Sequence, residues 1–303
     1  MILTSHRLDC MKLCMDLLIR GGSIKRFDHV CLLCNGVEGV HRDWINNLVE
    51  TNPDIPWDVI SGPRGRGKFI SNLQNECVKR HPDSLYFKID EDTFVSRDWD
   101  VKLIAAYEKF RGDDALSLIT PVVTNNQRGA YHLLTTFPEI GAEYTKQFNK
   151  PIKTDRMGPV WIFPKHAEFM MRTFLNLDAA NEKLRAAPGE DFLTFSYPFS
   201  INCLCYDWRH WKEIGGVPEE DENGWGEWIP KNKKFIVLAT RALVHHYSFF
   251  VQQNMLDRSS LLEDIREENL GERLGFFAKN IPRWTRTFAQ IPDALRRRLA
   301  KKP

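Results

Sequence analysis

The strongest constraint on the fold is a regular alternation of strand-like apolar runs with helical patterns. The chain opens with a strand-like run at residues 2–6, and a helical pattern of apolar side chains follows until Gly21 and Gly22. The same order continues with strand-like runs at 27–34, 57–60, 85–89 and 116–123 and with helical patterns at 70–80 and 100–110. Alternating strands and helices predict an α/β fold with a mainly parallel central sheet and helices on both faces.

The second half of the chain shows this alternation less clearly. Residues 125–154 have no clear period, so we expect a loop-rich section there. After it we expect a strand at 157–163, a helix at 165–177, a strand at 199–206, a helix at 208–214, strands at 235–238 and 242–244, and a charged surface helix at 256–271. These elements predict a second half attached to the first.

The composition excludes several classes of protein. Apolar residues make up 43% of the 303 residues and charged residues 27%, which is typical of a globular chain and not of a disordered one. No apolar run approaches the ~18 residues of a membrane-spanning helix, and the N-terminus lacks the pattern of a signal peptide.

The seven cysteines are scattered, mostly within apolar runs, which is typical of buried reduced thiols. We therefore expect a cytoplasmic protein. Cys31 and Cys34 have a spacing that zinc sites use, but both lie in one strand-like run. The other close pair, Cys203 and Cys205, is separated by a single residue, so the sequence does not favour zinc.

Basic residues concentrate at the C-terminus. Between residues 279 and 303, eight Lys or Arg stand against one acid, Asp293, so this tail carries +7 and the preceding residues carry −5 of the total of +2. The body therefore shows no footprint for nucleic acid. In the tail, basic residues alternate with aromatic and aliphatic ones, which favours attachment to an anionic membrane surface. A solvated or self-packing arm is the alternative.

Asp90, Glu91 and Asp92 directly follow the strand-like run at 85–89. In open α/β sheets, ligands bind beyond the carboxyl ends of the strands. Two carboxylates at such a place can share a divalent cation that also contacts the phosphates of a ligand. A solvated turn, or a cap on the following helix, is the alternative interpretation.

Basic and imidazole side chains follow other predicted strands. The loop at 61–68 combines glycines with Arg64, Arg66 and Lys68, which suits a phosphate although it lacks the spacing of a P-loop. A flexible basic loop is the alternative. His245 and His246 close another apolar strand, where they offer an imidazole to a metal or serve a structural role.

Acidic side chains after Gly215 and Gly216 are candidates for a general base, because a carboxylate accepts a proton from a hydroxyl. They comprise the run at 219–222 and Glu227. The run also suits an exposed helix N-terminus. Trp225 and Trp228, on either side of Glu227, would stack on a sugar or pack in the core.

Several of these residues occur in the order of one known family. Thr4–Arg7, Asn35–Gly36, Asn75 and Asp90–Asp92 come first, and Gly215–Gly216, Glu220–Asp221 and His245 follow. In this order and spacing, residues 1–250 resemble the GT-A-fold nucleotide-sugar glycosyltransferases, especially the large inverting glycosyltransferase family 2. The chain departs from that family in a shorter segment between Gly216 and Glu220 and in the absence of the Gly-Glu-Asp triplet.

The resemblance implies a GT-A domain over 1–250, with a nucleotide-binding half over 1–124, an acceptor-binding half over 125–250, and a helical extension over 251–303. It implies Mn²⁺ or Mg²⁺ on Asp90, Asp92 and one of His245 and His246. For the general base, it ranks Asp221 first, with Glu222 and Glu227 as alternatives. Around the nucleotide sugar we expect Thr4, Ser5, His6, Arg7, Asn35, Arg64, Arg66, Lys68, Asn75, Asp90, Glu91 and Asp92.

We therefore predict a metal-dependent, inverting transfer of a sugar from a nucleoside diphosphate, UDP or GDP, to a saccharide or lipid-linked saccharide acceptor. The basic tail would hold the protein on the cytoplasmic face of a membrane. Two alternatives stay open. One is a phosphoester hydrolase that uses Asp90, Asp92 and His245, and the other is a non-catalytic carbohydrate- or membrane-binding protein on the same fold.

Overall fold

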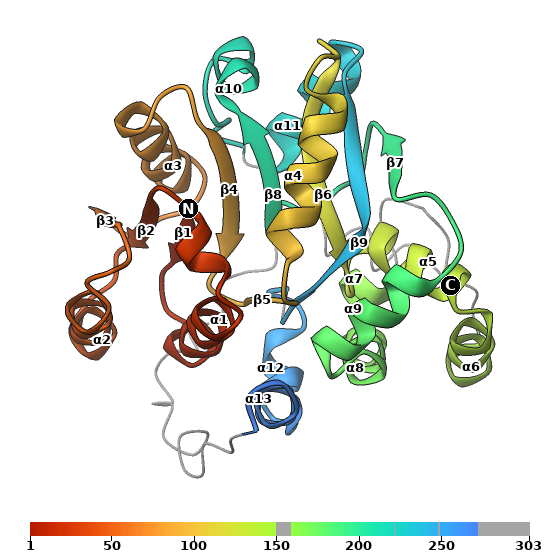
Figure 1. Cartoon of the computed structure of the whole chain (residues 1–303). Helices are drawn as coiled ribbons and strands as arrows, with labels where there is room; N and C mark the ends of the chain where they lie inside the picture. Colours follow the sequence, from red (N-terminus) through yellow and green to blue (C-terminus); the bar gives the residue numbers. More distant parts are fainter. Residues whose placement is uncertain (150–158, 221, 248, 272–303) are drawn as a thin grey trace, which may run out of the picture. The chain divides into compact units, whose positions relative to one another are not determined.

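A nine-stranded sheet forms the centre of the computed structural model (Figure 1), which describes residues 1–149, 159–220, 222–247 and 249–271. The order across the sheet is β3-β2-β1-β4-β8-β6-β9-β5, and β7 pairs with β9. The strands are β1 (Ile2–Thr4), β2 (Val30–Asn35), β3 (Trp57–Gly62), β4 (Leu85–Asp90), β5 (Thr93–Val95), β6 (Leu116–Val123), β7 (Phe192–Phe195), β8 (Cys203–Asp207) and β9 (Phe235–His246).

Most strands of this sheet run in one direction. β1, β2, β3 and β4 are mutually parallel, and β6 and β9 are parallel to each other. β8 lies between β4 and β6 and is antiparallel to both, so β6 and β9 run the same way as β4. The predicted α/β fold with a mainly parallel sheet is confirmed.

Helices cover the sheet, and strand alternation decides which side chains they meet. On β2, Cys31 and Leu33 pack with Leu73 and Cys77 of α3, whereas Leu32 and Cys34 belong to the large core on the other face. The helices are α1 (Leu8–Arg20), η1 (Ser23–Arg26), α2 (Gly39–Thr51), α3 (Lys68–Arg80), α4 (Trp99–Phe110), α5 (Gln127–Thr136), α6 (Pro138–Phe148), α7 (Pro159–Ile162), α8 (Pro164–Thr173), α9 (Leu177–Ala186), α10 (Trp208–Ile214), α11 (Glu222–Lys231), α12 (Gln253–Leu256) and α13 (Leu261–Leu270).

The expected loop-rich section at 125–154 is wrong over most of its length, because α5 and α6 occupy 127–148. Pro138 begins α6 directly after α5 ends, so each helix is too short to show a sustained period. The strand expected at 157–163 is also wrong in its described part, which contains the short helix α7.

One strand, β9, replaces the two strands expected at 235–238 and 242–244. Thr240 and Arg241 interrupt its apolar pattern, yet both are buried with their polar atoms satisfied. Thr240 Oγ1 donates to the carbonyl of Glu190, and Arg241 Nε donates to Asp191. Polar residues in a buried strand are tolerated when each finds a partner, and the sequence pattern does not show those partners.

The helix expected at 256–271 is present in shortened form as α13 at 261–270, and α12 ends at Leu256 before it; both lie within the compact unit formed by Met1–Glu272. Arg266 of α13 donates to Asp16 of α1 over 2.9 Å. In the described residues, no helix is both long and apolar enough to span a bilayer. The predicted membrane-binding tail, 279–303, lies outside the described residues.

Candidate metal and nucleotide site

Two carboxylates and one imidazole meet where β4 and β9 end. Asp90 closes β4, His246 closes β9, and the short strand β5 begins immediately after Asp92 and pairs with β9, placing Thr93 opposite His246. One ligand atom from each of Asp90, Asp92 and His246 lies within 4.8 Å of the other two. Of the candidates for metal binding, the structure brings these three together.

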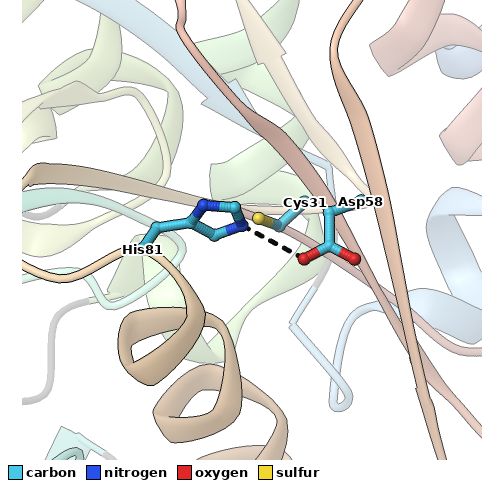
Figure 2. A group of neighbouring side chains, drawn as sticks. All are labelled: Cys31, Asp58 and His81. Atoms are coloured by element: carbon cyan, nitrogen blue, oxygen red, sulfur yellow. Dashed lines mark hydrogen bonds and ion pairs between the residues drawn. The ribbon is translucent and has the colours of Figure 1, made fainter.

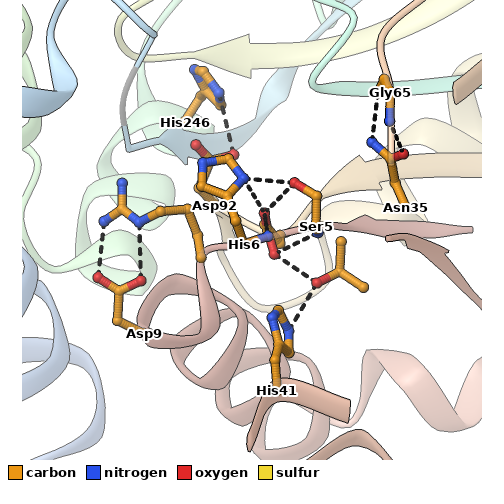
Figure 3. A network of polar contacts seen from close by, with 11 residues as sticks. Ser5, His6, Asp9, Asn35, His41, Gly65, Asp92 and His246 are labelled. Carbon is orange, nitrogen blue, oxygen red and sulfur yellow. Dashed lines mark hydrogen bonds and ion pairs between the residues drawn. The ribbon is translucent and has the colours of Figure 1, made fainter. Parts of the chain in front are cut away.

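Asp92 and His246 form an ion pair within this cluster (Figure 3). His246 Nε2 lies 3.3 Å from Asp92 Oδ1, and both side chains are largely buried. Burial acts to raise the pKa of Asp92, but the charge and hydrogen bond of His246 outweigh it and hold this pKa below its usual range. The other ring nitrogen of His246, Nδ1, is buried without a hydrogen-bond partner in the described residues. The nitrogen that faces Asp92 is Nε2, and an imidazole nitrogen beside two carboxylates suits a divalent cation.

Lys88 is a member of this site that sequence reasoning missed. Its ammonium lies 2.6 Å from Asp90 Oδ1 and also donates to the carbonyl of Ile201. Asn202 Nδ2 donates to the second oxygen of Asp90 over 2.7 Å. The sequence contained a signal for it, a lysine inside the apolar strand LYFKID, two residues before Asp90. Strand residues two apart share a face, so a lysine at this position points to the same side as Asp90.

Glu91, between the two aspartates, holds the chain at the end of β1. Its carboxylate accepts hydrogen bonds from the Thr4 hydroxyl, from the backbone N–H and hydroxyl of Ser5, and from the backbone N–H of His6. Thr4 also contacts His41 Nε2 at 3.1 Å. The structure thus brings Glu91 together with three of the residues expected around the nucleotide, and leaves His6 exposed.

Arg7, also expected at the nucleotide, is buried in an ion-pair network. Its guanidinium donates two hydrogen bonds to Asp9 and one to Asp257, and it lies over the ring of Tyr247. Arg7 therefore connects α1 with the residue that follows α12, and its charge is matched by two carboxylates inside the fold.

His245 points away from the cluster. It is fully buried, with Nδ1 2.8 Å from Thr124 Oγ1 and Nε2 3.1 Å from the carbonyl of Phe174. Burial lowers the pKa of His245 to about 3. Because neighbouring strand residues face opposite sides, only one of the two histidines can reach Asp92, and that residue is His246.

Asn35 positions the basic loop between β3 and α3. Its side-chain amide exchanges two hydrogen bonds of 2.9 Å with the backbone of Gly65. The next residue, Gly36, has φ +64°, and a Cβ there would collide with Arg64, so only glycine fits this turn.

The side chains of Arg64, Arg66 and Lys68 are exposed on the basic loop. The guanidinium of Arg66 lies over the ring of Phe250, 5.6 Å from the ring centroid. Phe250 follows His246 by four residues. The basic loop and the cluster of Asp90, Asp92 and His246 therefore belong to the same edge of the sheet.

Asn75 connects α3 to the turn after α10. Its Oδ1 accepts from Trp211 Nε1 and from the backbone N–H of Val217, each at 2.8 Å. A Cβ on Gly216 would lie 3.1 Å from the same oxygen. Asn75 thus positions the segment that leads to the acidic run.

The acidic run lies close to the basic loop. A Cβ on Gly67 would stand 2.9 Å from the carbonyl oxygen of Glu219. Of the three base candidates, Asp221 is outside the described residues, Glu222 is the half-buried first residue of α11, and Glu227 is exposed on α11. Trp225 is 1% exposed and stacks on His210, so it belongs to the core.

Similarity to known proteins is found in the fold and not in the sequence. No family model matches the sequence, and no curated protein matches it. Among solved structures, the chain is similar to the mannosyltransferase PcManGT from Pyrobaculum calidifontis in complex with GDP-Man and Mn²⁺, with 12% identity and a TM-score of 0.50 over 84% of this chain and 58% of that one.

A second solved structure is GalNAc-T7 with UDP, GalNAc and Mn²⁺, with 11% identity and a TM-score of 0.52. That match covers 88% of this chain and 46% of the other, so the chain spans about half the length of the structures it matches. The matches and the sheet topology confirm the predicted resemblance: in fold, the chain is similar to the GT-A glycosyltransferases.

Proposed function

We propose that this protein transfers a sugar from a nucleoside diphosphate sugar to a saccharide acceptor, with a divalent cation bound by Asp90, Asp92 and His246. The observation that carries the proposal is the convergence of these three side chains at the carboxyl edge of the sheet. The two similar structures contain a nucleotide or nucleotide sugar together with Mn²⁺, which supports the same ligand class here.

The described side chains suit a diphosphate. A bound Mn²⁺ or Mg²⁺ ion would neutralise the charge that develops on the leaving diphosphate. Arg64, Arg66 and Lys68 are exposed on the basic loop, where they would donate hydrogen bonds to phosphate oxygens. The buried ammonium of Lys88 offsets the charge of Asp90, which reduces the repulsion between the carboxylates of Asp90 and Asp92.

For the proton of the acceptor hydroxyl, we propose Asp221 as the base. The segment that precedes it lies beside α3 and the basic loop, because Ser71 donates to the carbonyl of Pro218 over 2.6 Å and Gly67 stands against the carbonyl of Glu219. A carboxylate opposite the leaving diphosphate would direct an in-line attack that inverts the anomeric carbon. We further propose that the acceptor is a lipid-linked saccharide and that residues 279–303 attach the protein to the membrane.

The test is donor binding by the full chain, measured calorimetrically with UDP-, GDP-, CMP- and dTDP-sugars in the presence and absence of Mn²⁺. We expect one UDP- or GDP-sugar to bind only with Mn²⁺. Asp92→Asn should lose the Mn²⁺-dependent binding of the donor. Asp114 is an exposed aspartate paired with Arg209, and the control variant Asp114→Asn should still bind the donor with Mn²⁺. Metal-independent binding of equal affinity would contradict the proposed cation site.

Product analysis separates a transferase from a hydrolase. With donor and Mn²⁺ but no acceptor, a transferase should release sugar slowly, and an acceptor should accelerate the reaction by orders of magnitude. Fast cleavage of simple phosphoesters would favour the hydrolase instead.

The base assignment has its own test. Asp221→Asn should keep donor affinity and lose about 10³-fold in transfer rate, because an amide does not accept the proton. If Glu227→Gln has that phenotype and Asp221→Asn is active, then Glu227 is the base.

A further inference from the structure

A second group of side chains that could bind a metal ion lies at the opposite edge of the same sheet, on β2 and β3. Cys31 and Asp58 are the second residues of β2 and β3, and they are register partners in the parallel pair. Register partners on adjacent strands point to the same face of a sheet. The Cys31 thiol and the Asp58 carboxylate therefore lie side by side at the amino-terminal edge, away from Asp90 and Asp92.

Helix α3 brings two further donors to this place. Cys77 and His81 are one helical turn apart, at the end of α3 and just after it, so they share a face. Cys77 packs in the same cluster as Cys31, and its hydrogen bond to Cys31 lowers the pKa of the Cys31 thiol and raises the pKa of the Cys77 thiol. The hydroxyl of Tyr86 on β4 donates to the carbonyl of His81 over 2.6 Å, which anchors the histidine.

The donor atoms are close enough to share one ion (Figure 2). Ligand atoms of Cys31, Asp58 and His81 all lie within 4.8 Å of one another, and His81 Nε2 is 3.1 Å from Asp58 Oδ2. In a zinc tetrahedron, ligand atoms stand roughly 3.3–3.8 Å apart, as bonds of 2.0–2.3 Å require. Small side-chain movements would bring the group to that geometry.

The site is open to an ion from solvent. The side chains of His81 and Asp58 are 18% and 21% exposed, and a cavity of about 250 Å³ lies beside Cys31, Cys77 and His81. Arg80 donates to Asp58 Oδ1, the oxygen that His81 does not contact, so one carboxylate oxygen is oriented while the other faces the cluster.

From this geometry we propose that Cys31, Asp58 and His81 bind a Zn²⁺ ion, whose fourth position is open to solvent. Thiolate and imidazole donors select zinc over Mn²⁺ or Mg²⁺, which prefer oxygen ligands. The ion would join β2, β3 and α3 at the end opposite the basic loop, and that loop connects β3 to α3. The zinc site is independent of the proposed transfer reaction.

The experiment uses Co²⁺ as a spectroscopic probe on chelator-treated full-length protein. A thiolate bound to Co²⁺ gives a charge-transfer band in the near ultraviolet, to which a site of carboxylates and imidazole does not contribute. We expect this band at one Co²⁺ per chain, and its displacement by Zn²⁺. Cys31→Ala should abolish the band, and His81→Gln should weaken Zn²⁺ binding at least about 10-fold.

Cys34→Ala is the matched control. Cys34 is a buried thiol on the same strand, but it packs on the opposite face. This variant should keep both the band and the affinity for Zn²⁺. If Cys31→Ala does not fold, the His81→Gln variant is used instead, because His81 is partly exposed. Its affinity for Zn²⁺, measured by competition with Co²⁺, then tests the proposal. Absence of the band in folded wild-type protein, or its persistence in Cys31→Ala, would overturn the proposal.

Discussion

The two edges of the sheet each carry an Asp–His pair with a further metal-binding side chain, yet their chemistry differs. At the carboxyl edge, Asp92 and His246 are joined by a second carboxylate, Asp90. At the amino edge, Asp58 and His81 are joined by a thiol, Cys31. Oxygen-rich sites suit Mn²⁺ and Mg²⁺, whereas a sulfur ligand favours Zn²⁺.

The surroundings differ as well. The carboxyl edge buries a lysine against its cluster and presents an exposed basic loop, so the proposed cation site lies beside side chains that suit phosphates. At the amino edge, the exposed Arg80 pairs with Asp58. Similar triads of side chains therefore lie among different loops and charges at the two edges. In parallel sheets, the loops that bind ligands follow the carboxyl ends of strands.

The largest expected effect separates the two edges directly. His246→Gln removes a ligand of the proposed Mn²⁺ site, so donor turnover should fall about 10³-fold, which corresponds to ~4 kcal/mol of transition-state stabilisation. The Co²⁺ charge-transfer band of the amino edge should be unchanged in the same variant. Loss of both signals together would show that the two edges are not independent.

A smaller effect is expected on stability. Lys88→Met leaves Asp90 without its buried partner, so the free energy of unfolding should fall by about 3 kcal/mol. Arg80→Met, which removes the exposed cation at Asp58, should cost less than about 1 kcal/mol. Urea denaturation of both variants measures the difference. Equal losses would mean that burial does not distinguish the two cations.

The smallest effect concerns the basic loop. Arg66→Met should weaken donor binding roughly 5- to 10-fold, because an exposed guanidinium contributes about 1 kcal/mol to a phosphate. The loss should shrink as salt is raised, since the charge is screened. Arg80→Met, at the other edge, should not change donor affinity, and calorimetry at two salt concentrations checks both statements. A salt-independent loss would indicate that Arg66 acts through Phe250 instead.

Local pattern was enough to predict most of the sheet. The runs that became β2, β4 and β6 are mostly apolar because these strands are buried on both faces, and the glycines after α10 end that helix as expected. The short helices α5 and α6 were not predictable in this way. They are stabilised by the burial of a few side chains in the tertiary structure, and their sequences show no sustained helical period.

For the site, the sequence by itself determined which side chains stand at strand ends, since that depends on where apolar runs stop. It did not determine what each one contacts. Glu91 and Asn75 are occupied by backbone groups far away in the sequence, and Cys31 meets His81 only after α3 has packed on β2.

The choice between His245 and His246 illustrates the physical reason. Adjacent residues of a strand point to opposite faces, and neither composition nor spacing states which face meets Asp92. The register of β5 against β9 places Thr93 opposite His246, and it is that pairing of distant segments that aims His246 at Asp92 and buries His245 against Thr124. Hydrogen bonding between strands decides register, so only the tertiary structure could decide the ligand.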